Sequence, residues 1–271
     1  MKRLWTLIAA VVLTSCGGGS GNLAIVGSSP STIGIGPQRL VMAEVDPESS
    51  AFVGGPDEQV TVSFTGPSNV SQTVTADWVW SIENVRGFLV ARPDFDQPGP
   101  WTATISSPRG TTSETTFAVS TDIAIPEVGD PVPASETRTT PEFALEAITT
   151  DPDPDPTFYE MTVAEAISNG TPALIVFATP AFCQTAVCGP TMEIVKEAVE
   201  GRSGFNTVHV EIFENVDSEG EGRLIEVPAV IEWGLPSEPW VYVVDADGVA
   251  TARFEGAVSP EELAAALDAL G

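Results

Sequence analysis

Two cysteines in the second half of the chain are the residues best suited to chemistry. Cys183 and Cys188 are separated by four residues and follow a continuous apolar run at 173–177. Such a run is typical of a strand that is buried on both faces. From Gly189 onward the apolar spacing of a helix begins. A thiol at the start of a helix faces the positive end of the helix dipole. This position stabilises a thiolate, the nucleophile of thiol-disulfide exchange.

The spacing of the two cysteines limits how they could be joined. On one helix, residues five positions apart lie about 7.5 Å apart along the axis, which is too far for a disulfide. A disulfide therefore requires Cys183 on the loop and Cys188 near the helix N-terminus, an arrangement that Pro180 and Pro190 favour. The loop closed by this bond is short, so its entropic stabilisation is modest and exchangeable chemistry is the better interpretation. The competing interpretation is a structural disulfide without redox activity.

The elements that position these cysteines are predicted to form an α/β unit at 158–271. From the first buried strand onward, apolar spacing and turn residues predict the order βαβαββα, a mixed sheet with helices on both faces. Capping boxes at 162–165 and 259–262 predict the start of two helices. The predicted strands span 173–177, 205–213, 240–245 and 249–254.

This order, with a cysteine loop after the first buried strand, resembles the thioredoxin fold. Residues 234–248, in which Pro239 precedes an apolar strand, resemble the second half of exported, TlpA-like thiol-disulfide oxidoreductases. The resemblance implies that Pro239 is a cis proline beside the active site, that Cys183 attacks a substrate disulfide, and that Cys188 resolves the mixed disulfide. It also implies that the partners are protein thiols or disulfides outside the cytoplasm and that no cofactor is needed.

Three features depart from the family pattern. The spacing is Cys-x4-Cys rather than Cys-x-x-Cys, Phe182 replaces the tryptophan before the first cysteine, and the strand at 173–177 has no buried acid. These departures bear on reductase efficiency and leave the thiol chemistry in place. The alternative function is a redox-inactive interaction module that uses the thioredoxin fold as a binding platform.

Two further thiol functions are weighed against these. Two thiols with a histidine suit Cu(I), as in SCO-type copper chaperones. The only histidine, His209, lies inside a predicted strand, so we expect a half-buried strand residue and no metal site. A peroxiredoxin is less well supported, because Thr179 stands one residue too far from Cys183 for that family's Thr-x-x-Cys motif, although Arg253 could imitate its activating arginine. One histidine also argues against most Ser-His-Asp and zinc sites.

Residues 35–120 are predicted to form an all-β, immunoglobulin-like sandwich. Short alternating segments recur between turn formers, and no cysteine pair crosses them. We therefore expect Trp78, Trp80 and Trp101 to supply much of the core. The region carries no catalytic set, so it is interpreted as a spacer or a docking module. The predicted strands span 39–45, 59–64, 72–80, 87–91, 101–106 and 112–119.

Residues 121–157 are predicted to be a linker between the two units. Asp and Pro alternate from 151 to 156, a pattern that excludes a helix and favours a stiff, extended chain. A calcium site is the competing interpretation, but calcium loops need a tight turn with glycine. We therefore expect a solvated spacer between the two units, with a linker draped over the second unit as the alternative.

The first residues are predicted to be an export signal and a lipid anchor. A short basic start precedes a ten-residue apolar run at 4–13, which is too short for the ~20 residues of a membrane span. The motif Leu-Thr-Ser-Cys that ends at Cys16 resembles the bacterial lipobox. This resemblance implies a lipoprotein signal peptide at 1–15, lipidation of Cys16, and a flexible tether at 16–34. The protein is then expected outside the cytoplasm, anchored to the bacterial cell membrane or outer membrane.

The charge balance limits the partners. The chain of 271 residues has 11 Lys and Arg against 38 Asp and Glu, a net charge of -27. Such a surface repels nucleic acid and anionic lipid, so neither is expected to bind through charge. Binding of cations or basic partners is one interpretation of this acidity, and a solubilising surface is the simpler one.

Overall fold

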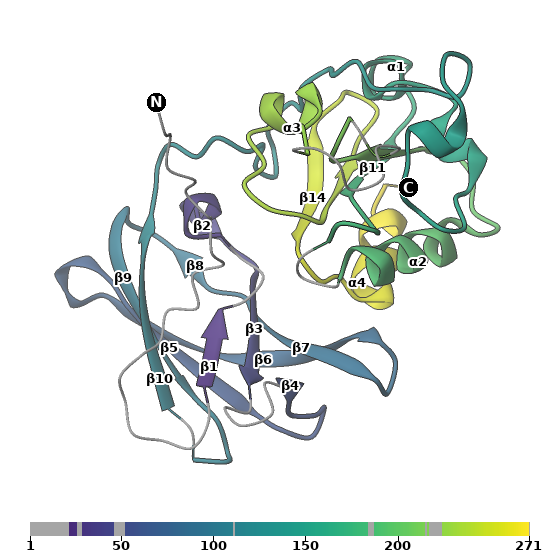
Figure 1. Cartoon of the computed structure of the whole chain (residues 1–271). Helices are drawn as coiled ribbons and strands as arrows, with labels where there is room; N and C mark the ends of the chain where they lie inside the picture. The colour runs from purple at the N-terminus through teal and green to yellow at the C-terminus, as the bar shows by residue number, and fades with distance from the viewer. Residues whose placement is uncertain are drawn as a thin grey trace, which may run out of the picture.

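The computed structural model is β-rich, with several sheets and a few helices (Figure 1). The predicted signal peptide at 1–15 and Cys16 lie outside the residues that it describes. None of the helices in the described part is long and apolar enough to cross a membrane. The structure describes residues 22–25, 29–45, 52–110, 112–183, 187–214, 216 and 224–270.

An eight-stranded sheet forms the N-terminal unit. Its strands are β1 (Asn22–Ile25), β3 (Leu40–Val45), β4 (Phe52–Val53), β5 (Val60–Thr65), β6 (Ser71–Ile82), β7 (Arg86–Ala91), β9 (Gly99–Ser106) and β10 (Thr112–Val119). They follow the order β1-β3-β7-β6-β5-β9-β10, with β4 beside β3. The first half of β6 pairs with β5 and its second half pairs with β7. The end strands β1 and β10 approach each other, so the sheet curls on itself (Figure 1). A separate short pair joins β2 (Gly36–Pro37) to β8 (Asp94–Phe95).

The core of this unit agrees in part with the tryptophan prediction. Trp101 is fully buried and packs against Phe95, which contacts Phe64 and Phe117 in turn. Trp78 is only half-buried at the margin of this core. Trp80, also half-buried, stacks edge-on against Trp78 and lies outside the core, so its predicted core role is wrong.

The C-terminal unit is built on a four-stranded mixed sheet with the order β12-β11-β13-β14. β11 is parallel to β12 and antiparallel to β13, and β13 is antiparallel to β14. The elements follow each other in the predicted order βαβαββα from β11 onward. The unit begins with α1 (Val163–Ser168). The seven elements that follow are β11 (Ala173–Ala178), α2 (Cys188–Val199), β12 (Asn206–Glu211), α3 (Pro228–Glu232), β13 (Trp240–Val244), β14 (Ala250–Glu255) and α4 (Pro260–Asp268).

The apolar run at 173–177 forms β11, a central strand buried on both faces. Ile175 and Phe177 face a core that includes residues of α1 and α3. Leu174 and Val176 face a second core that includes residues of α2 and α4. The predicted capping boxes open α1 and α4, and each satisfies two backbone donors at a helix start.

Two segments predicted as connectors carry structure. β1 lies inside the predicted tether at 16–34 and pairs with β3. The predicted linker at 121–157 packs on the C-terminal unit, where Ile125 and Ile148 join its two cores. Asp151, expected to be solvated, is buried and lies 3.2 Å from the ammonium of Lys196. An extended Asp-Pro chain can follow a protein surface, and this ion pair fastens it to α2.

The two units meet along β3 and β7. In the described chain these strands are buried along nearly their whole length, whereas β5 and β9 alternate between buried and partly exposed residues. The second face of β3 and β7 carries Val41, Ala43, Phe88 and Val90, which pack with Val187 and Ala257 of the C-terminal unit. This apolar contact is called the interdomain cluster below.

Candidate functional site

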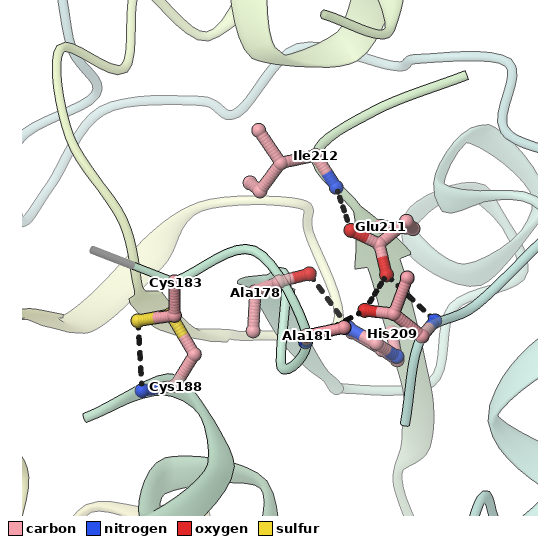
Figure 2. Close-up of a disulfide and its surroundings, with 8 residues drawn as sticks. Ala178, Ala181, Cys183, Cys188, His209, Glu211 and Ile212 are labelled. Atoms are coloured by element: carbon pink, nitrogen blue, oxygen red, sulfur yellow. Dashed lines mark hydrogen bonds between the residues drawn. A yellow bond between two sulfur atoms is a disulfide. The ribbon is translucent and has the colours of Figure 1, made fainter. Parts of the chain in front are cut away.

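The two cysteines of the C-terminal unit are joined by a disulfide at the N-terminus of α2 (Figure 2). Their Cα atoms lie 6.0 Å apart, with Cys183 on the loop after β11 and Cys188 as the first residue of the helix. The sequence predicted this placement from the spacing. Cys188 is fully buried and Cys183 is half-buried. The two sulfur atoms therefore differ in their access to a partner.

The start of α2 lacks a side-chain cap, and a sulfur atom takes its place. Val187 precedes the helix and accepts no amide through its side chain. Instead, the backbone N–H of Cys188 donates to Sγ of Cys183 at 3.3 Å (Figure 2). Pro190 fits the first turn because it has no N–H to satisfy there. An amide at a helix N-terminus, directed at sulfur, is an arrangement that stabilises a thiolate.

Pro239 lies at the end of β11 from which the cysteine loop departs. The Glu238–Pro239 peptide bond is cis, as the sequence resemblance implied. Pro239 immediately precedes Trp240, which pairs with Phe177 one residue before the end of β11. Pro239 is buried, and the register brings it to the same edge of the sheet as the cysteine loop.

A buried histidine lies beneath this loop. His209 on β12 is 3% exposed, so the expected half-buried position is wrong. Its Nε2 lies 3.1 Å from the carbonyl oxygen of Ala178 (Figure 2). Its Nδ1 lies 2.6 Å from the hydroxyl of Tyr159. A carbonyl only accepts, so Nε2 carries the hydrogen and donates to Ala178. The Tyr159 hydroxyl also donates to the hydroxyl of Thr149 at 3.0 Å. Nε2 thus ties β12 to the end of β11, and Nδ1 ties β12 to Tyr159.

A buried carboxylate two residues further on β12 is tied to the same loop. Glu211 accepts from the backbone N–H and the hydroxyl of Thr150 at 2.8 and 2.7 Å, and from the N–H of Ile212 at 3.1 Å. The Thr150 hydroxyl in turn accepts from the N–H of Ala181 at 3.2 Å (Figure 2). This chain of hydrogen bonds joins the 121–157 segment, β12 and the cysteine loop.

Sequence reasoning missed Glu211, Thr150 and Tyr159. The strand at 173–177 has no buried acid, as the sequence indicated, but Glu211 supplies one from the neighbouring strand at a position paired with Ala178. A signal was present, because His209 and Glu211 alternate with apolar residues and so lie on one face of a strand. Their partners, Tyr159 and Thr150, lie 50 and 61 positions away in the chain and could not be inferred from local pattern.

The histidine predicts a pH dependence of stability. Burial lowers the pKa of His209 below its usual value of 6.5. The unfolded chain therefore takes up the proton first as pH falls. We expect the free energy of unfolding to be undiminished above pH 6.5 and to decrease as pH falls toward the lower folded pKa, by at most about 1.4 kcal/mol per pH unit. Urea unfolding between pH 8 and pH 5 measures the slope.

The matched control for this prediction is His209→Gln, which keeps two hydrogen-bonding groups and does not titrate. Burial raises the pKa of Glu255, which contributes a slope of opposite sign. Glu255 is unchanged in the variant, so the difference between the two proteins isolates the histidine. Equal slopes in both proteins between pH 6.5 and pH 5 would refute the assignment.

The interdomain cluster covers apolar residues next to the disulfide. Val187 directly precedes Cys188 and is 5% exposed, and Ala257 follows β14 and is 2% exposed. Both pack with side chains of β3 and β7. A partner that approached the buried side of the disulfide would have to displace the N-terminal sheet.

Ionic contacts fasten the same interface. Arg39 donates to both carboxylate oxygens of Glu262 on α4, at 2.9 and 2.8 Å, and Arg92 donates to the same carboxylate at 2.6 Å. Burial alone would raise the pKa of Glu262, but hydrogen bonds and positive charge from Arg39, with charge from Arg92, outweigh it and lower the pKa. Glu262 also accepts from the N–H of Ser259 within its capping box. One side chain therefore joins α4 to two arginines of the N-terminal unit.

The remaining candidate residues belong to structure. Arg253, considered as an activating arginine, donates to the carbonyl of Thr32 and the amide oxygen of Gln38, both in the N-terminal unit. In the described chain no three His, Cys, Asp or Glu side chains gather as a metal site would require.

Comparison with known proteins assigns no family. No protein-family model and no curated protein matches the chain. A solved structure of a "putative glycoside hydrolase" from Bacteroides vulgatus is 18% identical over 38% of this chain, with a TM-score of 0.23. The match covers 22% of that hydrolase chain, about a fifth of its length. A TM-score of this size carries no argument about fold or activity.

Proposed function

We propose that this protein exchanges disulfides through Cys183 and Cys188. The observation that carries the proposal is the hydrogen bond from the Cys188 N–H to Sγ of Cys183 at the first turn of α2. A sulfur that accepts from a helix N-terminus is stabilised as a thiolate, and thiolates are the attacking and leaving groups of exchange. The unequal burial of the two cysteines supports a division of roles, with Cys183 meeting the partner and Cys188 resolving.

The fold assignment belongs to the same proposal. We infer that the C-terminal unit is a thioredoxin-like domain, similar to exported TlpA-like oxidoreductases, and that the N-terminal unit is a curled relative of immunoglobulin-like sandwiches. The sheet order β12-β11-β13-β14, the disulfide at the start of α2 and the cis peptide before Pro239 support the first assignment. The antiparallel pairing of β10, β9, β5 and β6 in the larger sheet supports the second.

The exchange balances without a cofactor. In the reduced protein, the Cys183 thiolate attacks one sulfur of a partner disulfide, forming a mixed disulfide and releasing the other partner sulfur as a thiolate. The Cys188 thiolate then attacks Sγ of Cys183, forming the intramolecular disulfide and releasing the second partner thiolate. The partner gains two electrons and the cysteine pair loses two. The reverse sequence oxidises a partner dithiol.

Equilibration of the full chain with glutathione buffers of graded potential tests the proposal. An exchangeable pair is expected to have a potential above about -300 mV and to equilibrate rapidly. A lower potential together with slow exchange would mark a structural bond and overturn the proposal. Cys183→Ser is the control, because it cannot form the disulfide between residues 183 and 188 and so should show no such redox transition.

A redox-inactive interaction module is the second candidate. The interdomain cluster favours it, because the N-terminal sheet occupies the apolar surface beside the disulfide. This function predicts slow exchange with an intact fold, the outcome opposite to the one above. A Cu(I) chaperone is tested separately, by adding equimolar Cu(I) to the reduced protein and measuring uptake.

We propose in addition that the protein is held at a membrane outside the cytoplasm through lipidated Cys16. The lipobox-like motif and the preceding apolar run support this location. Cys16→Ser is expected to move the protein from the membrane fraction to the soluble fraction in a bacterial host. Retention of the variant in the membrane fraction would refute the anchor.

A further inference from the structure

Two adjacent residues, Thr150 and Asp151, contact both elements that carry the cysteines. The Thr150 hydroxyl contacts the cysteine loop, where it accepts from the N–H of Ala181 at 3.2 Å. The Asp151 carboxylate contacts α2, where it lies 3.2 Å from the ammonium of Lys196, and the two side chains are 2% and 17% exposed. The loop and the helix are therefore joined by the disulfide and, in addition, by two neighbouring residues from another part of the chain.

The direction of the Thr150 hydroxyl is set by Glu211. A hydroxyl has one hydrogen, and here it donates to a carboxylate oxygen of Glu211 at 2.7 Å. The backbone N–H of Thr150 donates to the same oxygen at 2.8 Å, so the residue is held at two points. Glu211 is itself buried, at 5% exposed. The lone pairs of the hydroxyl therefore remain for the N–H of Ala181.

The cysteine loop depends on this outside contact for its shape. Among its described residues, one backbone hydrogen bond closes a turn, from the N–H of Phe182 to the carbonyl of Thr179 at 3.2 Å. The N–H of Ala181, inside the same turn, has its acceptor outside the loop, in Thr150. Cys183 follows two residues later, so the place of its sulfur depends on a hydroxyl 31 positions before the loop.

We propose that Thr150 is a positioning residue for the Cys183–Cys188 pair. It holds the loop while Asp151 holds α2, and so raises the effective concentration of each thiol at the other. Groups held in the reacting geometry avoid the entropic cost of being brought together. The disulfide is thereby stabilised relative to the dithiol. The step in which the Cys188 thiolate attacks Sγ of Cys183 and releases the partner thiolate becomes faster. The effect on rate rests on the proposed disulfide exchange, whereas the effect on the equilibrium does not.

Equilibration of full-chain variants with glutathione tests the proposal. Thr150→Val removes the hydroxyl and keeps the shape of the side chain. We expect the equilibrium constant for forming the disulfide to fall about threefold or more, which raises the reduction potential by ~14 mV or more. Loss of a hydrogen bond that forms mainly in the disulfide state accounts for a change of this size. Thr150→Ser keeps the hydroxyl and should restore the original potential. Thr140→Val is the matched control, because it removes a hydroxyl that donates to the Tyr159 carbonyl, and it should leave the potential unchanged.

A kinetic measurement separates positioning from a general loss of structure. After reduced protein is mixed with oxidised glutathione, the glutathione joined to Cys183 is released when Cys188 attacks. We expect Thr150→Val to slow this release about threefold or more. Alkylation of Cys183 by iodoacetamide, measured with Cys188→Ser present, needs no second thiol and should change less than about twofold. An equal slowing of both reactions would contradict the proposal.

Hydrogen exchange in the unaltered protein gives a test that does not depend on how well a variant folds. The Ala181 amide should exchange more slowly in the oxidised than in the reduced protein, because its contact with Thr150 forms mainly in the disulfide state. Equal exchange in both states, an unchanged potential in Thr150→Val, or no recovery in Thr150→Ser would each overturn the proposal. Failure of the proposed function looks different: exchange with glutathione is then slow in every variant, while the potentials reached after long incubation still decide the role of Thr150.

Discussion

Cys183→Ser is expected to abolish disulfide exchange with a partner protein, whereas Cys188→Ser is expected to trap the partner as a stable mixed disulfide. The physical reason is the difference between the two sulfur positions. Cys183 is half-buried and its sulfur accepts from a helix N-terminus, while Cys188 is fully buried. Removal of Cys188 leaves the attacking thiolate and takes away the group that releases the partner. Non-reducing electrophoresis after mixing with a disulfide-bonded substrate protein measures both results.

The reactivity of the reduced, unaltered protein gives a quantitative form of the same prediction. We expect iodoacetamide to modify Cys183 faster than Cys188, on the order of tenfold or more, because access and thiolate character both favour Cys183. Peptide mass spectrometry at short times measures the two rates. Equal rates, or a partner trapped by Cys183→Ser instead, would reverse the assignment of roles.

Glu262→Ala is expected to weaken the packing of the two units and to lower the free energy of unfolding by about 3 kcal/mol or more. The Arg39 and Glu262 side chains are only 14% and 12% exposed. Loss of the carboxylate leaves Arg39 without its bidentate partner, removes one partner of Arg92, and breaks the capping box of α4. Urea unfolding measures the stability, and hydrogen exchange at β3 and β7 reports on the interface.

Glu261→Ala is the matched control, because Glu261 lies one position away on the same helix and is exposed. It should change stability little. A second variant distinguishes the contribution of the ion pairs from that of the helix cap. Glu262→Gln keeps an acceptor for the N–H of Ser259 and removes the charge that pairs with the arginines. If hydrogen exchange at β3 and β7 in Glu262→Ala matches that of Glu261→Ala, the interface does not depend on this carboxylate.

Acid should reproduce part of the effect in the unaltered protein. The arginines hold the pKa of Glu262 below its ordinary value of 4.5 despite its burial. A carboxylate with a lowered folded pKa contributes its full stabilisation above the unfolded pKa and loses it as pH falls through the folded pKa. We therefore expect the interface to loosen below about pH 4.5. Glu262→Gln should lack this component, and an identical acid profile in both proteins would contradict it.

The sequence alone predicted the elements around the cysteines because their signals are local. A continuous apolar run required a strand buried on both faces, and β11 is one. The capping boxes beginning at Thr162 and Ser259 each specified a helix start within four residues of chain. The spacing of Cys183 and Cys188 required one cysteine on the loop and one at the helix start, for the geometric reason that a single helix holds them too far apart.

Other features depended on contacts between residues far apart in the chain. The hydrogen bonds from Thr150 to Glu211 and from Tyr159 to His209 join residues 61 and 50 positions apart, and no local pattern encodes such partners. The 121–157 segment looked like a spacer because prolines exclude regular structure within it. A pattern that excludes a helix does not show whether an extended chain is solvated or packed. In the structure this segment is packed, because Ile125 and Ile148 join the cores of the C-terminal unit.

The interdomain surface is another feature that depended on distant contacts. β3 and β7 are buried on both faces, unlike the alternating β5. The sequence predicted alternating strands in this region, so it did not indicate that the second face of β3 and β7 would be covered. It could not indicate what covers the second face. The apolar residues of a strand can indicate that a face is buried. Which residues pack on that face depends on how the two units pack together. Only the tertiary structure brought Val187, beside Cys188, against that face.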